Sequence, residues 1–115
     1  MPYYLIQVAY TPESMAALVK NPRNRAEEVR PAIERLGGKV HGFWFCLGDY
    51  DVVHLVEMPA NSDVAAFAAA AFAGGGLKEI KTTPLLTPEE SVAALNKASL
   101  TRYESPSRTA VKITA

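Results

Sequence analysis

Hydrophobic residues along the chain fall into four short runs of strand character, separated by segments with helical spacing. The four runs are rich in aromatic and β-branched residues and span residues 3–10, 39–47, 52–58 and 77–83. Between the first two runs, apolar positions three and four residues apart predict helical structure up to about Leu36. A further helix is predicted over residues 64–73, and a last one starts at Thr87. The order β, α, β, β, α, β, plus an extra C-terminal helix, predicts an α+β, ferredoxin-like fold with a four-stranded antiparallel sheet.

The first helical region is predicted to contain two helices. Thr11 as N-cap and Pro12 at the first helical position start the first one. Asn21-Pro22 interrupts it and is predicted to cap the second. Arginine and glutamate alternate along the second helix, a pattern typical of a solvated face with weak ion pairs. The residues concerned are Arg23, Glu27, Arg30 and Glu34.

Both faces of the predicted sheet are apolar. In the first strand, one face carries Tyr4, Ile6, Val8 and Tyr10, and the other carries Tyr3, Leu5, Gln7 and Ala9. Helices can cover only one face, and a large exposed apolar patch is rare on a monomer. We therefore predict a homodimer, or a larger assembly, in which the uncovered faces of two sheets pack together. The alternative is that the final helix or the tail covers this face within one chain.

Length and charge narrow the class of protein. The 115 residues predict one compact domain, which we expect over 1–100, followed by a polar tail or partner-binding arm over 101–115. Twelve Lys and Arg balance twelve Asp and Glu, which argues against binding to nucleic acid or to an anionic membrane. The single cysteine, the lack of a membrane-length apolar run and the lack of a signal-peptide pattern favour a reducing, cytoplasmic setting. No cofactor is predicted.

The segment Gly48-Asp49-Tyr50-Asp51 between the second and third strands is the most distinctive part of the chain. It is predicted to be a tight hairpin whose two-residue turn, Asp49-Tyr50, places Phe45 opposite His54. In a functional interpretation, two carboxylates and a phenol orient a polar ligand or accept a proton. In a structural interpretation, Gly and Asp are simply good turn residues.

The two histidines and the single cysteine also allow either a functional or a structural interpretation. His41 and His54 are predicted to share a sheet face about 13 Å apart, which is too far for one metal ion, so no metal site is predicted. His54, between Val52 and Val56, is either a core histidine or an acid–base group in a cavity. Cys46 has no evident base beside it and is expected to be structural.

The tract around the hairpin resembles the GYD-domain family. The matching segments are Gly42-Phe43-Trp44, Leu47 to Val53 (LGDYDVV), Val56-Glu57, Leu36 to Val40 (LGGKV) and Lys81 to Thr83 (KTT). The resemblance covers roughly residues 3–95. It implies a ferredoxin-like subunit of the dimeric α/β-barrel type, and it implies no particular activity because the family is essentially uncharacterised. The matching residues are Gly48, Tyr50, Asp51, Thr82 and Thr83; neither histidine belongs to the pattern.

Three hypotheses for the function follow. The first is a small-molecule-binding protein with a pocket between sheet and helices or at the subunit interface, lined by Trp44, Tyr50, Asp51 and Thr83. The second is a cofactor-independent enzyme, of monooxygenase or isomerase type, acting on a small aromatic or carbonyl compound. In that case His54 or Asp51 is the base, and Trp44 or Tyr50 positions the ring. The third is a structural or interaction protein without a pocket.

Overall fold

The computed structural model describes residues 1–107 of the chain. It divides the chain into two compact units, Met1–Leu85 and a second one that begins at Leu86, and each is described by itself. Within the segment that we expected to be a polar tail, residues 101–105 form neither helix nor strand. Residues 106 and 107 are assigned as helix, and residues 108–115 lie outside the described residues.

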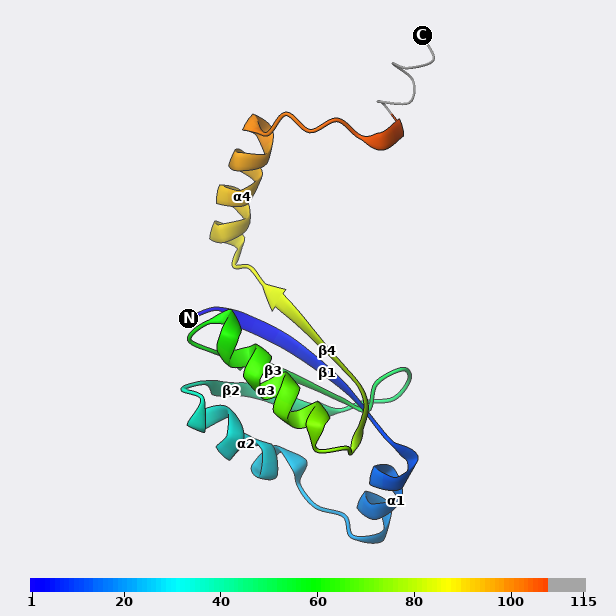
Figure 1. The fold of residues 1–115 in the computed structure, drawn as a ribbon. Helices are drawn as coiled ribbons and strands as arrows, with labels where there is room; N and C mark the ends of the chain where they lie inside the picture. Colours follow the sequence, from blue (N-terminus) through cyan, green and yellow to red (C-terminus); the bar gives the residue numbers. More distant parts are fainter. Residues whose placement is uncertain (108–115) are drawn as a thin grey trace. The chain divides into compact units, whose positions relative to one another are not determined.

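The first unit is a four-stranded antiparallel sheet with helices on one face (Figure 1). Its elements, in chain order, are β1 (Tyr3–Tyr10), α1 (Pro12–Lys20), α2 (Arg25–Arg35), β2 (Lys39–Phe45), β3 (Val52–Glu57), α3 (Asn61–Ala73) and β4 (Leu77–Leu85). The strands lie side by side in the order β2-β3-β1-β4. This topology confirms the predicted ferredoxin-like fold.

Side-chain caps explain where the first two helices begin. The Thr11 hydroxyl accepts a hydrogen bond from the Ser14 N–H at 3.1 Å, as expected for an N-cap. The cap of α2 is Asn24, whose side chain accepts from the Ala26 N–H at 3.0 Å. Asn21 ends α1 instead of capping α2, so the predicted start of the second helix is three residues too early.

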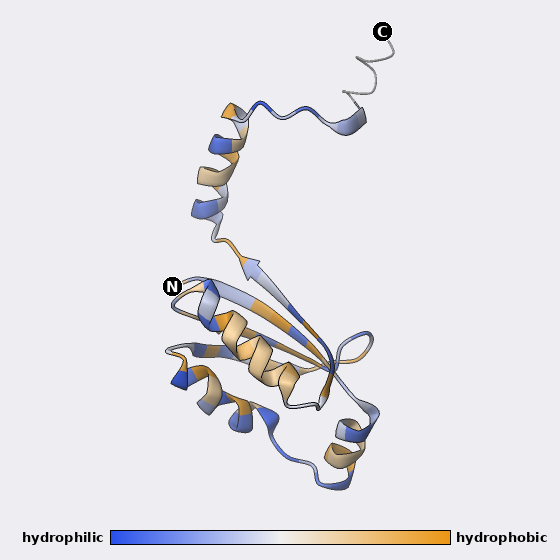
Figure 2. Ribbon diagram, in the orientation of Figure 1, coloured by the Kyte–Doolittle hydropathy of each residue, from blue (hydrophilic) through white to orange (hydrophobic). Residues whose placement is uncertain are grey.

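The core lies between the sheet and the helices α2 and α3. Figure 2 shows apolar residues along the strands and over most of α3. The buried cluster consists of Tyr4, Ile6, Val8, Ile33, Val52, Val56, Met58, Val64 and Phe67. Burial of each large apolar side chain stabilises the fold by about 1.5–3 kcal/mol, so this one cluster accounts for much of the hydrophobic stabilisation of the unit.

The register of β2 against β3 differs from the prediction by two residues. The ladder closes where the Cys46 N–H donates to the Asp51 carbonyl at 2.8 Å, which leaves a four-residue loop in place of a two-residue turn. Consequently Phe43, and not Phe45, lies opposite His54. A shift of two residues keeps each side chain on its face of the sheet, so the predicted faces of this part of β2 survive the error.

A β-bulge in β2 moves His41 to the other face. Val40 and Gly42 pair with consecutive residues of β3, so His41 is the extra residue of the bulge. Its Nε2 lies 2.7 Å from Oε1 of Glu57, on the face that α2 and α3 leave uncovered. The prediction that His41 and His54 share a face is therefore wrong, because the bulge reverses the alternation from His41 back to Lys39.

The uncovered side of the sheet, called the outer face below, carries an apolar patch with charged and polar residues beside it. The strand registers place on it the apolar residues Tyr3, Leu5, Ala9, Trp44, Val53, Leu55 and Leu85, together with Gly42. They also place on it Gln7, Lys39, Glu57, Glu79, Lys81 and Thr83. The Trp44 side chain, 55% exposed, lies across Gly42, where an added Cβ would stand 2.2 Å from the indole. Only glycine permits this contact between ring and backbone.

Asp51 joins three strands at one end of the sheet. Its N–H donates to the Val8 carbonyl at 2.8 Å, and its carboxylate accepts from the Tyr10 N–H at 2.9 Å, both in β1. Its carbonyl accepts from the Cys46 N–H at the end of β2. Because Asp51 itself leads into β3, a single residue holds the ends of β1, β2 and β3 together.

The loop before Asp51 reaches the fourth strand. Gly48 has a φ of +110°, a conformation that favours glycine. The Tyr50 hydroxyl donates to the carboxylate of Glu79 in β4 at 3.2 Å. Desolvation and the neighbouring Glu79 raise the pKa of Tyr50. The four-residue loop thus connects the β2–β3 hairpin to the strand at the opposite edge of the sheet.

The second unit contains the predicted C-terminal helix, α4 (Pro88–Leu100). The Thr87 hydroxyl accepts from the Glu90 N–H at 3.1 Å, and the Glu90 carboxylate accepts from the Thr87 N–H at 2.8 Å. This reciprocal pair is the predicted capping box. Among the described residues, the helices are all too short or too polar to cross a lipid bilayer.

We expect Asp51→Ala to lower the free energy of unfolding by about 1–3 kcal/mol, because the Tyr10 N–H loses a charged acceptor. Asp51→Asn keeps an oxygen acceptor and should lose less. Urea unfolding measures both effects. The matched control is Asp49→Ala, in the same loop, whose side chain is exposed. A loss for Asp51→Ala no larger than that of the control would contradict the structural role of Asp51.

Candidate functional site

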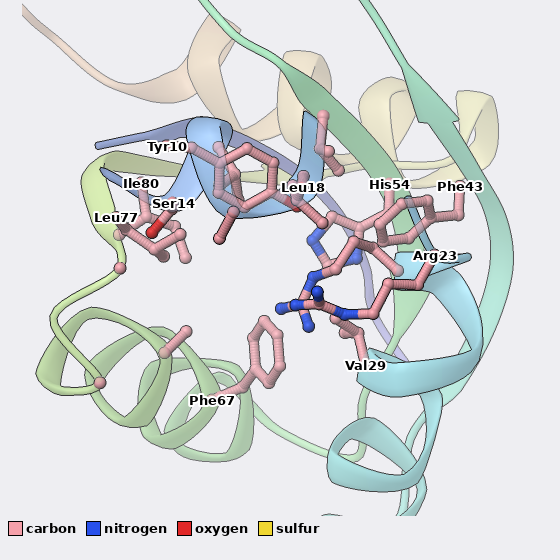
Figure 3. Close-up of a pocket in the computed structure, with 17 residues that line it drawn as sticks. Tyr10, Ser14, Leu18, Arg23, Val29, Phe43, His54, Phe67, Leu77 and Ile80 are labelled. Atoms are coloured by element: carbon pink, nitrogen blue, oxygen red, sulfur yellow. The ribbon is translucent and has the colours of Figure 1, made fainter. Parts of the chain in front are cut away.

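A cavity of about 290 Å³ lies between the covered face of the sheet and the helices α1, α2 and α3 (Figure 3). All four strands and all three helices of the first unit contribute to its wall. The apolar part is formed by Val8, Ala17, Leu18, Val29, Phe43, Val52, Phe67, Ala71, Leu77 and Ile80. The polar part is formed by Tyr10, Ser14, Arg23, Arg25 and His54.

His54 is the buried polar residue of this wall. It lies in the middle of β3, where alternation turns it toward the helices, and it is 2% exposed. Its ring packs against Phe43, with centroids 5.2 Å apart, and edge-on against Phe67 at 5.9 Å. Its Nδ1 is buried and has no hydrogen-bond partner. Burial lowers the pKa of His54 to about 4, so the ring is neutral at pH 7.

Two arginines give the cavity its charge. Arg23 precedes α2 and Arg25 is its first residue, and both pair with the carboxylate of Glu28, at 3.0 and 3.2 Å. Desolvation opposes the ionisation of Glu28, but hydrogen bonds from Arg25 and Arg23 lower the pKa of this carboxyl below its usual value. Desolvation likewise opposes the charge of Arg25, but Tyr10 and Glu28 raise the pKa of its guanidinium.

A second cavity, of about 480 Å³, adjoins the first on the side of the arginines. The two cavities share six wall residues: Tyr10, Leu18, Arg23, Arg25, Phe43 and Val52. Arg23 and Arg25 thus stand between the two spaces. Their guanidinium groups can face a molecule bound in either one.

The wall at the start of α1 depends on a close approach to Gly76. The Thr11 N–H donates to the Gly76 carbonyl at 3.1 Å, which ties α1 to the segment before β4. A Cβ at Gly76 would lie 2.9 Å from the Ser14 hydroxyl. That hydroxyl accepts a hydrogen bond from Thr11 Oγ1 at 3.0 Å, and Ser14 lines the cavity.

The structure separates the residues that the sequence analysis proposed for a ligand site. His54 lies in the cavity wall. Asp51 directly precedes the wall residue Val52, and its carboxylate accepts a hydrogen bond from the Tyr10 N–H. Trp44 and Thr83 lie on the outer face, on the two edge strands β2 and β4. Tyr50 binds Glu79. A ligand site that uses Trp44, Tyr50 and Thr83 at a subunit interface stays a prediction.

The outer face carries a polar cluster of its own at one end. Glu57 pairs with His41, and the imidazole of His41 packs against Tyr3 with ring centroids 5.1 Å apart. The hydrogen bond from His41 lowers the pKa of the Glu57 carboxyl. Within residues 1–107, His, Cys, Asp and Glu form no group of three or more that could hold a metal ion.

Sequence reasoning misses the arginines and Tyr10. The alternating charges predict a solvated ion-pair face for Arg23, and that interpretation holds for Arg30, which lies 3.9 Å from Glu27. The sequence offers one signal that could have identified the arginines: Arg23 and Arg25 flank Asn24, which caps α2. Only the tertiary structure shows that this start of α2 lies beside the cavity.

The first unit is therefore an α+β protein of ferredoxin-like topology with a cavity between its sheet and its helices. The GYD domain family model matches residues 4–95, most of the chain, and the protein belongs to the GYD domain family. This confirms the resemblance carried by the segment around Tyr50. No curated protein matches the chain.

The solved structures that are similar to this chain share little sequence with it. TTHA0845 from Thermus thermophilus has 16% identity and a TM-score of 0.50, and the match covers 76% of this chain and 95% of that one. MtbAldR has 16% identity and a TM-score of 0.51, covering 75% and 52%. An uncharacterized NIPSNAP domain protein from Burkholderia xenovorans has 16% identity and a TM-score of 0.48, covering 76% and 94%. The first two support the fold assignment and nothing about activity.

The buried His54 predicts a pH dependence of stability. An unfolded histidine titrates near 6.5, whereas the pKa of folded His54 is about 4. Between these values the unfolded chain binds a proton that the folded chain does not, so the free energy of unfolding falls as the pH falls. The expected loss is about 3 kcal/mol over this window. Urea unfolding at several pH values between about 7 and about 4 measures it.

Substitutions test whether His54 causes this pH dependence. His54→Leu should remove most of the slope between about pH 6.5 and about pH 4.5, where most carboxyl groups are still ionised. The control His41→Asn, on the outer face, should leave the slope attributed to His54 in place. Equal slopes in the wild-type protein and in His54→Leu would show that His54 is not the group responsible.

Proposed function

We propose that the protein binds a small, mainly apolar molecule in the cavity between the sheet and its helices. The observation that carries the proposal is His54, which is buried in the cavity wall with its Nδ1 unpartnered. An unsatisfied buried polar group costs roughly 1–3 kcal/mol, and native proteins keep such groups chiefly where they serve a function or meet an additional molecule.

The composition of the wall supports the same proposal. Ligand sites combine mainly apolar walls with a few polar groups that fix the orientation of the ligand. Here the apolar wall surrounds a short set of polar residues, from His54 to the two arginines. A volume of about 290 Å³ is at the small end of the range for ligand pockets, which favours a small ligand.

A cofactor-independent enzyme is the second candidate, and the lowered pKa of His54 in an apolar cavity favours it. A general base works best with a pKa near the working pH, however, and a pKa of about 4 makes His54 a weak base at pH 7. A neutral imidazole is better suited to donating or accepting a hydrogen bond. Asp51, the other candidate base, already uses its carboxylate to accept a hydrogen bond from the Tyr10 N–H. Binding is therefore the leading proposal.

Blocking the cavity tests the binding proposal. Ala71 lines the cavity from α3, so Ala71→Phe should fill part of it and weaken binding of small aromatic probes at least about tenfold. The probes are phenol, phenylacetamide and phenylacetate, titrated into ¹⁵N-labelled protein and followed by NMR. The matched control is Ala69→Phe on the exposed side of the same helix, which should bind the probes as the wild-type protein does.

Two results would contradict this proposal. One is that the wild-type protein binds none of the probes and retains no small molecule in native mass spectrometry. The other is that Ala71→Phe and Ala69→Phe bind the probes equally well. Either result would favour the hypothesis of an interaction protein without a ligand pocket.

We also propose that the outer face packs against the outer face of a second copy. Its centre is the cross-strand pair of Leu5 and Leu55, flanked by Trp44 and Val53, and α2 and α3 lie on the other side of the sheet. Two identical apolar faces related by a twofold axis can cover each other. Such a pairing removes both from water and leaves the cavity of each subunit on the far side of its own sheet.

The oligomeric state tests this pairing. Leu55→Lys places a charge at the centre of the outer face and should convert a dimer, or a larger assembly, to monomers in analytical ultracentrifugation. The control Ala65→Lys changes an exposed position on α3 and should leave the assembly unchanged. A wild-type protein that sediments as a monomer at micromolar concentration would contradict the pairing.

A further inference from the structure

We propose that the ligand of the cavity is a small aryl carboxylate, with its carboxylate held by Arg25 and Arg23 and its ring placed against His54, Phe43 and Phe67. This inference rests on the proposed function and adds the chemical class of the ligand. It follows from the charge of the wall, the hydrogen-bonding capacity of the arginines and the rings that face the cavity.

The charge of the cavity wall is positive. Of the described residues that line the two adjoining cavities, none is an Asp or a Glu, whereas Arg23 and Arg25 line both. Both arginines pair with one carboxylate, Glu28. One carboxylate offsets only one of two guanidinium charges, so this group of three residues keeps one positive charge beside an apolar space. A monoanion would balance that charge.

The arginines retain donors for a ligand. A guanidinium has five N–H donors in a planar fork. Arg23 donates through Nε to Glu28 and through Nη1 to the Asn21 carbonyl at 3.3 Å. Arg25 donates through Nη1 to Glu28, and its side chain also forms a hydrogen bond with the side chain of Tyr10. Each guanidinium therefore has N–H groups beyond these bonds, and their geometry suits the two oxygens of a carboxylate.

The guanidinium group of Arg25 is also placed for strong binding. The side chain of Arg25 is 32% exposed and partly desolvated, whereas that of Arg23 is 39% exposed and remains open to solvent. Arg23 and Arg25 line the same cavity as His54 and Phe67, and Figure 3 labels Arg23 beside these rings. In a partly desolvated position a charge-assisted hydrogen bond is stronger than on an open surface. An ion pair formed here should resist salt better than an exposed one.

Three rings favour an aromatic body for the ligand. Phe43, His54 and Phe67 form a continuous set of ring contacts along the wall, with centroid distances of 5.2 and 5.9 Å. Aromatic pairs gain stability from offset or edge-on contacts beyond the area that they bury. The neutral His54 ring adds one hydrogen-bonding position among them, which a hydroxyl or carbonyl substituent on the ligand can use.

Glu28 then acts as an internal competitor for the ligand carboxylate. It occupies donors of both arginines in the absence of a ligand. Removing its charge should free those donors and raise the net positive charge. Glu28→Gln should therefore increase the affinity for an aryl carboxylate, whereas loss of a merely structural contact would leave it unchanged or lower it.

The test compares acids with their neutral amides. Benzoate, phenylacetate and 1-naphthylacetate, each beside its amide, are titrated into the wild-type protein by NMR and isothermal titration calorimetry. We expect at least one acid to bind about tenfold or more tightly than its amide, because the charge-assisted bonds are lost in the amide. Added salt should weaken binding of the acid and leave binding of the amide unchanged.

Variants locate the carboxylate. Arg25→Gln should lower the affinity for the acid about tenfold and change that for the amide by less than about threefold, and Arg25→Lys should lie between. The matched control is Arg30→Gln, also on α2, where Arg30 pairs with Glu27 and lines neither cavity. Arg30→Gln should bind both probes as the wild-type protein does. The ¹⁵N spectrum of each variant confirms that it is folded.

The outcomes separate this inference from the proposed function. If amides bind as tightly as acids, or if Arg25→Gln and Arg23→Gln leave the affinity for the acids unchanged, the anion site is wrong while binding in the cavity stands. If neither acids nor amides bind, and native mass spectrometry finds no retained molecule, both proposals are wrong. Tighter acid binding that is lost in Arg25→Gln and raised in Glu28→Gln supports the anion site.

Discussion

The first unit depends on the hydrogen bonds of Asp51 at the point where three strands meet. Its N–H donates to the Val8 carbonyl and its carboxylate accepts from the Tyr10 N–H, both in β1. Its carbonyl accepts from the Cys46 N–H at the end of β2. Tyr10 lines the cavity, as does Val52, the residue after Asp51. The residue that closes the hairpin therefore also fixes one wall of the site. The tyrosine and aspartate of the family signature have an architectural role in this protein, since each binds a strand that is distant in sequence.

Much of this architecture is accessible from the sequence because it rests on local periodicity. Alternation in β1 and β3 identifies the two faces of the sheet, and it turns His54 toward the helices. The predicted hairpin loop is two residues too short, yet the faces are correct because a shift of two preserves alternation. The predicted face of His41 is wrong, because one extra residue in a bulge reverses the alternation. A bulge arises from the pairing of two strands, so no pattern within β2 alone reveals it.

The candidate site is only partly predictable from the sequence, because part of it depends on tertiary packing. His54 stands out in a sequence because a titratable ring between buried valines is unusual. Arg23 and Arg25 do not stand out, since charged residues around a helix start normally face solvent. Their place in the wall follows from the packing of α1, α2 and the sheet around one space, a property of the tertiary structure. Two carboxylates and a phenol in one loop suggest chemistry; in the structure Tyr50 and Asp51 connect strands, and a ligand role for them stays a prediction.

The contact between Trp44 and Gly42 makes the outer face optically accessible. The chain has one tryptophan, so its indole fluorescence arises from a single side chain that lies half exposed on this face. The emission wavelength of an indole depends on the polarity around it. Covering the outer face would therefore shift the emission to the blue, and an external quencher would report how accessible the face remains. The cavity lies on the other side of the sheet, so the same signal distinguishes events on the two sides of one four-stranded layer.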